Sequence, residues 1–157
     1  MFENNIDAIL EIVGKEREAG YRETLESLAN DLGVKERVKF SGWIPFDRIK
    51  EVYMRNDIQI ISSLAEGTPR VIIEGAANGI PLICTNVGGN TESLISGENA
   101  MIIPPADSKA IAEAIIHIIR DAPLRQKLIK NGYALARQFS FDVLGVAIAD
   151  EIAACVG

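Results

Sequence analysis

Residues 57–89 decide the fold, and they read DIQIISSLAEGTPRVIIEGAANGIPLICTNVGG. The apolar run from Asp57 to Ser62 is typical of a buried strand. The next segment, Pro69 to Asn78, begins with proline and is followed by Gly79, which is the usual punctuation of a helix. Pro81 to Thr85 is predicted as another strand, and its residues Pro81 to Cys84 form a second apolar run. The stretch therefore predicts a strand, a loop, a helix and a second strand.

The same alternation continues on both sides of this stretch. Nearly continuous apolar strands that alternate with helices favour a parallel sheet covered on both faces. We therefore predict an α/β fold, a Rossmann-like open parallel sheet with helices on both faces, with residues 1–157 as one nucleotide-sugar-binding domain. The further elements that we expect are strands over Ala8 to Val13 (buried), Arg37 to Ser41 and Ala100 to Ile103, and helices over Tyr21 to Leu32, Pro45 to Arg55, Ser108 to Arg120 (capped by Asp107), Pro123 to Phe139 and Phe141 to Val156.

Composition excludes several classes of protein. The chain has 157 residues and a formal net charge of -6, and an acidic chain is a poor partner for nucleic acid. Its two cysteines, Cys84 and Cys155, form neither a disulfide framework nor a metal spacing, so we expect a reducing, cytoplasmic setting and no metal or other cofactor. No stretch approaches the ~20 apolar residues of a membrane span. Peripheral contact with a membrane stays open.

The loop from Leu64 to Arg70 is the first candidate site, because ligands of open parallel sheets lie outside the carboxyl ends of the strands. Gly67 permits a close backbone approach. Thr68 can cap the helix that follows, and the amides of its first turn have no partner within the helix. Such a turn suits a phosphate or a polarised hydroxyl. Arg70 adds a cation.

Two carboxylates frame this loop, and each has two interpretations. A carboxylate can bind the vicinal hydroxyls of a sugar or stabilise positive charge at an anomeric carbon. Glu66 and Glu74 could equally be solvated surface residues, the commonest kind of carboxylate. Glu74, however, lies in a helix that is otherwise apolar or small, where a charge needs a partner.

Three motifs in this region, EGTPRVIIE (66–74), ANGIP (77–81) and VGGNTE (87–92), resemble the group 1 glycosyltransferase family. Members of that family carry two glutamates separated by seven residues at the donor site. The resemblance covers nearly the whole chain, because it includes LEIVG (10–14), VKFSGW (38–43), GEN (97–99), PPAD (104–107) and FSF (139–141).

The resemblance implies the C-terminal, donor-binding half of a GT-B fold that transfers a sugar with retention, as in polysaccharide biosynthesis. Glu74 would hold the ribose, and Glu66 would lie beside the donor sugar as the catalytic carboxylate. The remaining donor-binding residues implied are Gly67, Thr68, Pro69 and Arg70 at the sugar and diphosphate, Gly42, Trp43 and Ile44 at the base, and Gly88 and Gly89 in a loop close to the ligand. Glu92 would brace that loop or simply begin a helix.

This sequence departs from the family pattern in several ways. The family's first strand-helix unit, which carries an arginine and a lysine for the diphosphate, is missing, and so is the N-terminal acceptor-binding domain. We therefore expect a partner domain, in cis or in trans, and weak or absent turnover by the chain alone. Arg70 and Val71 stand where many members have Phe-Gly. Gly75 replaces a common alanine and should weaken its helix by up to ~1 kcal/mol.

Other interpretations remain beside this one. The chain could be a non-catalytic nucleotide-sugar-binding module, an epimerase on the same architecture or an inactive remnant. A dehydrogenase is disfavoured, because the first strand is not followed by Gly-x-Gly-x-x-Gly. Trp43 is either a core residue or a shelf for the base. His117, the single histidine, is interpreted as a residue on the flank of its helix.

Overall fold

The structure, a computed structural model, describes residues 6–67, 70–140 and 142–146. The chain divides into two compact units, Met1–Glu51 and Val52–Gly157. That these units together act as one nucleotide-sugar-binding domain stays a prediction.

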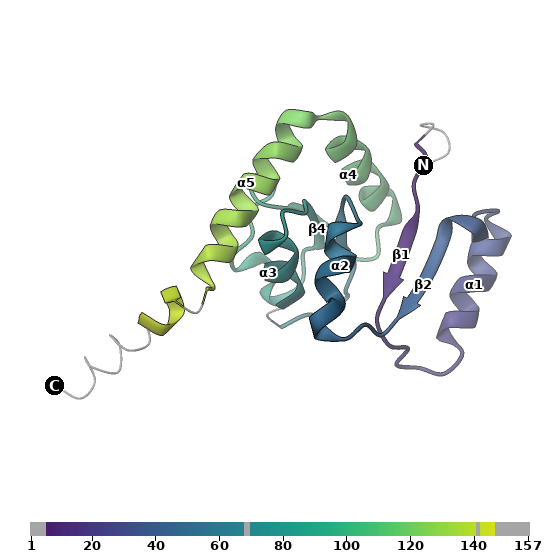
Figure 1. Cartoon of the computed structure of the whole chain (residues 1–157). Coiled ribbons are helices and arrows are strands. Elements are labelled where there is room, and N and C mark those ends of the chain that lie inside the picture. The colour runs from purple at the N-terminus through teal and green to yellow at the C-terminus, as the bar shows by residue number, and fades with distance from the viewer. Residues whose placement is uncertain (1–5, 68–69, 141, 147–157) are drawn as a thin grey trace. The chain divides into compact units, whose positions relative to one another are not determined.

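The first unit is built on two parallel strands, β1 (Leu10–Val13) and β2 (Val38–Gly42). The helix α1 (Tyr21–Asp31) connects them and lies beside β2 (Figure 1). A short 3-10 turn (Lys35–Arg37) precedes β2, and another (Phe46–Arg48) precedes α2 (Ile49–Met54). The helix predicted over Pro45 to Arg55 is therefore shorter and begins as a 3-10 turn.

One expectation for this unit was wrong. β1 is not a buried strand, since Leu10 is 48% exposed and Val13 is also exposed. Among the described residues β1 pairs only with β2, so one of its edges has no partner strand. Toward the C-terminal end of α1, Ala29 is buried, but Leu28 and Leu32 are exposed. The side of α1 that faces β2 instead carries Arg22, whose guanidinium lies 5.1 Å from the centre of the Phe40 ring.

The second unit holds a three-stranded parallel sheet in the order β3-β4-β5. The strands are β3 (Gln59–Ile61), β4 (Leu82–Thr85) and β5 (Met101–Ile103). The helices are α3 (Arg70–Ala77), α4 (Ser108–Arg120) and α5 (Ala122–Gln138), and a 3-10 turn, η4 (Gly88–Thr91), follows β4. The central strand β4 is buried along its whole length, which explains its continuous apolar sequence.

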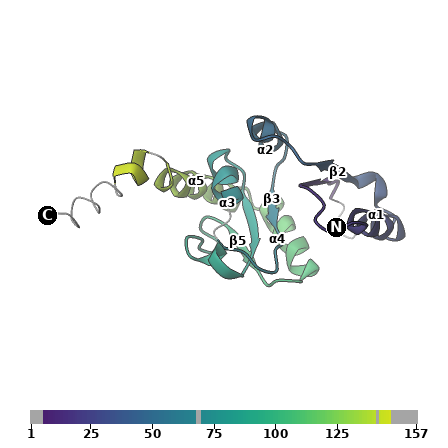
Figure 2. The same ribbon diagram turned by 90° about the horizontal axis from the view of Figure 1, so that it is seen from below.

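The core of this unit has one cluster on each face of the sheet. Successive side chains of a strand point to opposite faces. Accordingly, Leu82 and Cys84 of β4 belong to a cluster with Ile72 of α3, while Ile83 joins a cluster with Ile115 and Ile118 of α4. The helices α3 and α4 thus cover opposite faces (Figure 2). The predicted Rossmann-like parallel architecture is confirmed.

The helix ends in this unit follow sequence rules. Asp107 caps α4 as predicted, because its Oδ1 accepts a hydrogen bond of 2.9 Å from the amide of Ala110. Asp121 caps α5 in the same way, through the amide of Leu124 at 2.8 Å. Cys84 is fully buried, as expected, and Cys155 lies outside the described residues.

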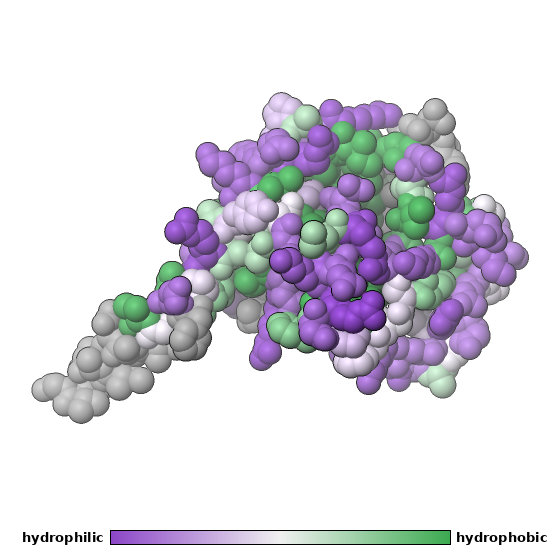
Figure 3. Space-filling model, in the orientation of Figure 1, coloured by the Kyte–Doolittle hydropathy of each residue, from purple (hydrophilic) through white to green (hydrophobic). Residues whose placement is uncertain are grey.

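Of the helix predicted over Phe141 to Val156, the structure describes residues 142–146 as helical. Val143, Leu144 and Val146 are exposed there, and Figure 3 shows hydrophobic atoms in this segment beside the grey C-terminal residues. In the described part of the chain, no helix has the length and apolar character needed to span a bilayer.

Candidate functional site

The candidate site lies where β3 and β4 end. The carboxyl ends of neighbouring parallel strands meet at one edge of a sheet, so the two loops that follow come together. Two hydrogen bonds join them: the Thr85 hydroxyl donates to the Ser63 carbonyl at 2.6 Å, and the Gly89 amide donates to the Glu66 carbonyl at 3.3 Å. The loop that carries Glu66 is therefore anchored to the loop that carries the two glycines.

The Glu66 carboxylate is held in place. Its Oε1 accepts a hydrogen bond of 2.6 Å from the Ser63 hydroxyl, and the side chain is half-buried. This contact argues against a freely solvated loop residue. Gly67 follows and is exposed, whereas Thr68 and Pro69 lie outside the described residues.

Gly88 is required by a close approach between the two loops. Its φ is +48°, a conformation that side chains disfavour, and a Cβ at this position would overlap the Glu66 carbonyl oxygen. The predicted close passage of this loop is therefore seen against the Glu66 backbone. Its passage close to a ligand stays a prediction.

Sequence reasoning missed Asn90, which supports this loop. Asn90 is fully buried, and its Nδ2 donates to the Thr85 carbonyl at 2.9 Å. Its Oδ1 is buried with no hydrogen-bond partner among the described residues. A polar residue directly after two glycines was the available signal.

Glu74 has the partner that its apolar helix demands. It lies half-buried in the second turn of α3, and its Oε2 accepts a hydrogen bond of 3.0 Å from the hydroxyl of Tyr53. Burial, and then the charge of Glu74, raise the pKa of the Tyr53 hydroxyl well above its usual value. The hydroxyl therefore stays protonated and donates. The sequence alone gave Tyr53 no role.

A second missed residue, Gln59, lies behind this pair. Its Nε2 donates to the Val71 carbonyl at 2.9 Å, and its Oε1 is buried without a partner among the described residues. A Cβ at Gly75 would collide with that Oε1. The glycine that looked like a helix-weakening departure thus makes room for Gln59. The signal was a polar residue inside the apolar run DIQII.

The first turn of α3 is accessible at its side chains. Arg70, the first residue of α3, is exposed, and Val71 is exposed as well. An exposed first turn is compatible with the predicted contact between its amides and a phosphate.

The three residues predicted to border the base belong to the first unit. Gly42 has a φ of +65° and accepts a hydrogen bond of 2.9 Å from the Gly14 amide. Trp43 is 61% exposed, with the Lys15 Nζ 5.2 Å from its ring centre, and Ile44 is half-buried. The exposed ring rules out the core interpretation of Trp43. A role beside a base stays a prediction.

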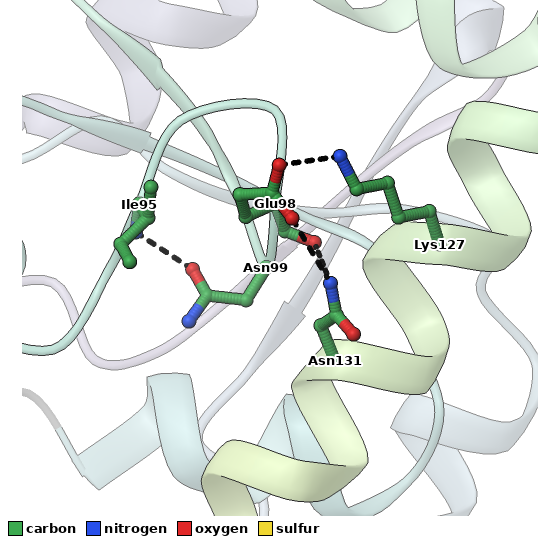
Figure 4. Close-up of polar contacts among 5 residues, drawn as sticks. All are labelled: Ile95, Glu98, Asn99, Lys127 and Asn131. Atoms are coloured by element: carbon green, nitrogen blue, oxygen red, sulfur yellow. Dashed lines mark hydrogen bonds and ion pairs between the residues drawn. The ribbon is translucent and has the colours of Figure 1, made fainter.

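The 93–100 loop, which continues from η4, is tied to α5 (Figure 4). Lys127 forms an ion pair of 2.5 Å with Glu98, and the Asn131 Nδ2 donates to the Glu98 carbonyl at 2.9 Å. Within the loop, the Asn99 Oδ1 accepts from the Ile95 amide at 2.8 Å. These contacts give the GEN motif a structural role, because they fix the 93–100 loop to α5. Glu92, before the loop, is exposed and follows the end of η4. No helix begins at Glu92, so the helix-start interpretation was wrong, and its bracing of the loop stays a prediction.

Other features of the chain involve none of the residues of the candidate site. One hollow, of about 410 Å³, is lined by Ala77, Tyr133, Ala136, Arg137 and Ser140. Another, of about 270 Å³, lies between α1 and β2 in the first unit. His117 is exposed and 3.6 Å from Asp121, which confirms its place on the flank of α4. Among the described residues, no three His, Cys, Asp or Glu side chains gather as a metal site.

Comparison with known proteins decides the family. The model of the family described as glycosyl transferases group 1 matches residues 2–135. The chain belongs to the group 1 glycosyltransferases. It is 35% identical over 124 residues to the lipopolysaccharide core biosynthesis glycosyltransferase LpsE of Rhizobium meliloti, covering 78% of this chain and 36% of LpsE. It is 34% identical over 129 residues to a D-inositol 3-phosphate glycosyltransferase of Acidothermus cellulolyticus, covering 79% and 29%. This group 1 chain thus spans about a third of the length of such relatives.

Solved structures of similar proteins agree with the GT-B fold of this glycosyltransferase chain. HepE of Anabaena in complex with UDP has a TM-score of 0.86 and 26% identity, with 94% of this chain and 41% of HepE covered. The complex of HepE with UDP-glucose has a TM-score of 0.84 and 27% identity, with 93% and 41% covered. The C-terminal domain of a group 1 protein, LpcC of Francisella tularensis, shares the fold at 21% identity and a TM-score of 0.72, with 88% and 89% covered.

Proposed function

We propose that this chain is the donor-binding domain of a retaining hexosyltransferase that uses a UDP-sugar. The observation that carries the proposal is the junction of the loops after β3 and β4, where Glu66 is anchored by Ser63 and by the Gly89 amide. Membership of the group 1 family and the UDP and UDP-glucose complexes of HepE support the choice of ligand.

In this proposal the two glutamates have separate tasks. A carboxylate offers two acceptor oxygens, so Glu74 accepts hydrogen bonds from the ribose hydroxyls of the nucleotide. The amides of the first turn of α3 and the cation of Arg70 neutralise the diphosphate. Gly67, Thr68 and Pro69 contact the donor sugar.

The transfer step breaks the bond between the anomeric carbon and the diphosphate oxygen, and the leaving UDP carries away the electron pair. Positive charge develops on the sugar, and the Glu66 carboxylate beside it stabilises that charge. The acceptor hydroxyl attacks from the face that the diphosphate leaves and gives its proton to the leaving diphosphate oxygen, and this same-face attack preserves the anomeric configuration. No metal ion is proposed for this step.

The proposal assigns acceptor binding to a second domain, in cis or in trans, because the chain spans 41% of the HepE chain. The name of LpsE supports a saccharide acceptor in polysaccharide biosynthesis. The second candidate function is a non-catalytic nucleotide-sugar-binding module that needs a partner N-terminal domain. That the chain spans only 41% of HepE favours this second candidate as well.

Calorimetric titration tests the nucleotide-binding part. We expect UDP to bind more tightly than GDP or ADP, and Glu74→Gln to weaken UDP about tenfold or more, since hydrogen bonds to a charged group contribute roughly 1.5–3 kcal/mol. Glu113→Gln, on the exposed side of α4, is the matched control. Equal affinity for the three nucleotides, or equal effects of the two substitutions, would contradict the proposal.

A chimera with the N-terminal domain of an active group 1 relative tests catalysis. Glu66→Gln should abolish most sugar transfer while the affinity for UDP changes little, because Glu66 acts on the sugar rather than on the nucleotide. Transfer that is unchanged by Glu66→Gln would favour the non-catalytic module.

A further inference from the structure

We propose that Tyr53 is a positioning residue for Glu74, and that its hydroxyl orients the carboxylate so that the second oxygen meets the ribose hydroxyls of the nucleotide. This inference rests on the function proposed above and adds a residue to it. It also predicts that Tyr53 affects nucleotide affinity only through the ribose hydroxyls.

The geometry makes Tyr53 a rigid donor. The residue is 8% exposed, at the end of α2, and its Oη lies 3.0 Å from Glu74 Oε2. An ionised carboxylate only accepts hydrogen bonds, so the hydroxyl must donate. A glutamate side chain has three rotatable bonds, and one fixed contact at Oε2 removes most of that freedom before a ligand arrives.

The surroundings keep this donor in its protonated state. Burial and the neighbouring carboxylate raise the pKa of the Tyr53 hydroxyl, while a hydrogen bond with Gln59 acts in the opposite direction. Gln59 reaches this place because Gly75 has no Cβ to block it. Its Nε2 is fixed by the Val71 carbonyl at 2.9 Å.

The position of the pair explains why it matters for a ligand. Glu74 is half-buried in α3, and its neighbour Gly75 is fully buried. A carboxylate at such a boundary can turn toward solvent when it loses its inner partner. Tyr53 prevents this turn, so that the carboxylate is already oriented when the nucleotide binds.

The test is a double-mutant cycle with Tyr53→Phe, Glu74→Gln and the double variant, each titrated with UDP and with 2′,3′-dideoxy-UDP. We expect Tyr53→Phe to weaken UDP about fivefold to tenfold, the effect of an ordinary hydrogen bond, because Tyr53 acts on the nucleotide only through Glu74. We expect no further loss in the Glu74→Gln background and no loss for the dideoxy ligand. Tyr133→Phe, at an exposed tyrosine on α5, is the matched control.

A measurement on the unmodified chain covers the case in which Tyr53→Phe fails to fold. With 13C-labelled tyrosine, the Tyr53 Cζ signal should shift on addition of UDP and stay unchanged with dideoxy-UDP, while the Tyr133 signal stays unchanged with both. A Tyr53 signal that ignores UDP would overturn the inference. Equal weakening of both ligands by Tyr53→Phe would overturn it too, because that result indicates a structural role alone.

The cycle separates two kinds of failure. If Glu74→Gln weakens UDP and Tyr53→Phe does not, the inference is wrong and the proposed function stands. If UDP does not bind, or if Glu74→Gln has no effect, the proposed function fails and the inference fails with it.

Discussion

Gly88→Ala is the substitution that most sharply tests the junction of the two loops. At Gly88 the backbone φ is +48°, and a Cβ would overlap the carbonyl oxygen of Glu66. The obstructing atom belongs to the backbone, so a rotation of a side chain cannot relieve the overlap. One of the two loops must therefore move.

The loss of unfolding free energy expected for Gly88→Ala has two parts. An alanine in the left-handed region costs about 1–2 kcal/mol. Forcing extra volume into a packed contact costs typically 1–3 kcal/mol more. We therefore expect Gly88→Ala to lower the free energy of unfolding by about 2–5 kcal/mol. Gly97→Ala isolates the first part, because Gly97 has a φ of +75° and open space around its Cβ position.

Urea unfolding followed by far-UV circular dichroism measures the difference. The single tryptophan, Trp43, lies in the first unit, so its fluorescence would not report on the loops of the second unit. Gly97→Ala should cost about 1–2 kcal/mol, and Gly88→Ala should cost more and also weaken UDP binding. Equal unfolding free energies for the two variants would refute the close approach of the loops.

Three further predictions concern the second unit. Asp107→Ala removes the cap of α4 and should lower the free energy of unfolding by about 1 kcal/mol in urea titrations, with UDP affinity unchanged. Gly75→Ala should be less favourable in the wild type than in a Gln59→Ala background, where it should stabilise the helix by up to ~1 kcal/mol; additive effects in this cycle would show that the two residues are not in contact. Burial raises the pKa of the Cys84 thiol to about 11 from an ordinary 9.0. The protonated thiol favours the folded state, so its contribution to stability is complete below pH 9 and is lost as the pH rises toward 11. Cys84→Ala should remove this pH dependence, and in a variant that lacks the chain's other cysteine the native thiol should resist a disulfide reagent at about pH 8.

The α/β alternation could be predicted because strands and helix ends each have a local sequence pattern. Residues 82–84 are apolar without interruption, which is typical of a central parallel strand, and β4 is such a strand. Asp107 could be predicted as a cap, since capping depends on residues three positions apart. The exposure of β1 could not be predicted. Its apolar residues have the same pattern whether the strand is central or at an edge.

The candidate site was predictable only in part. A charge in an apolar helix demands a partner, so a partner for Glu74 was expected, but its identity depends on how α2 packs. The pairing of Gln59 with Gly75 needs the same packing information. Each residue looked anomalous by itself, one as a polar residue in a strand and the other as a glycine in a helix.

A titration of 15N-labelled chain with UDP tests the central claim most directly, because it reports which amides the ligand approaches. We predict the largest shifts at Gly67, Arg70, Gly88 and Gly89, the residues of the two joined loops and the first turn of α3. Shifts confined to other places, such as the surface of α5 around Tyr133, would contradict the assignment of the site.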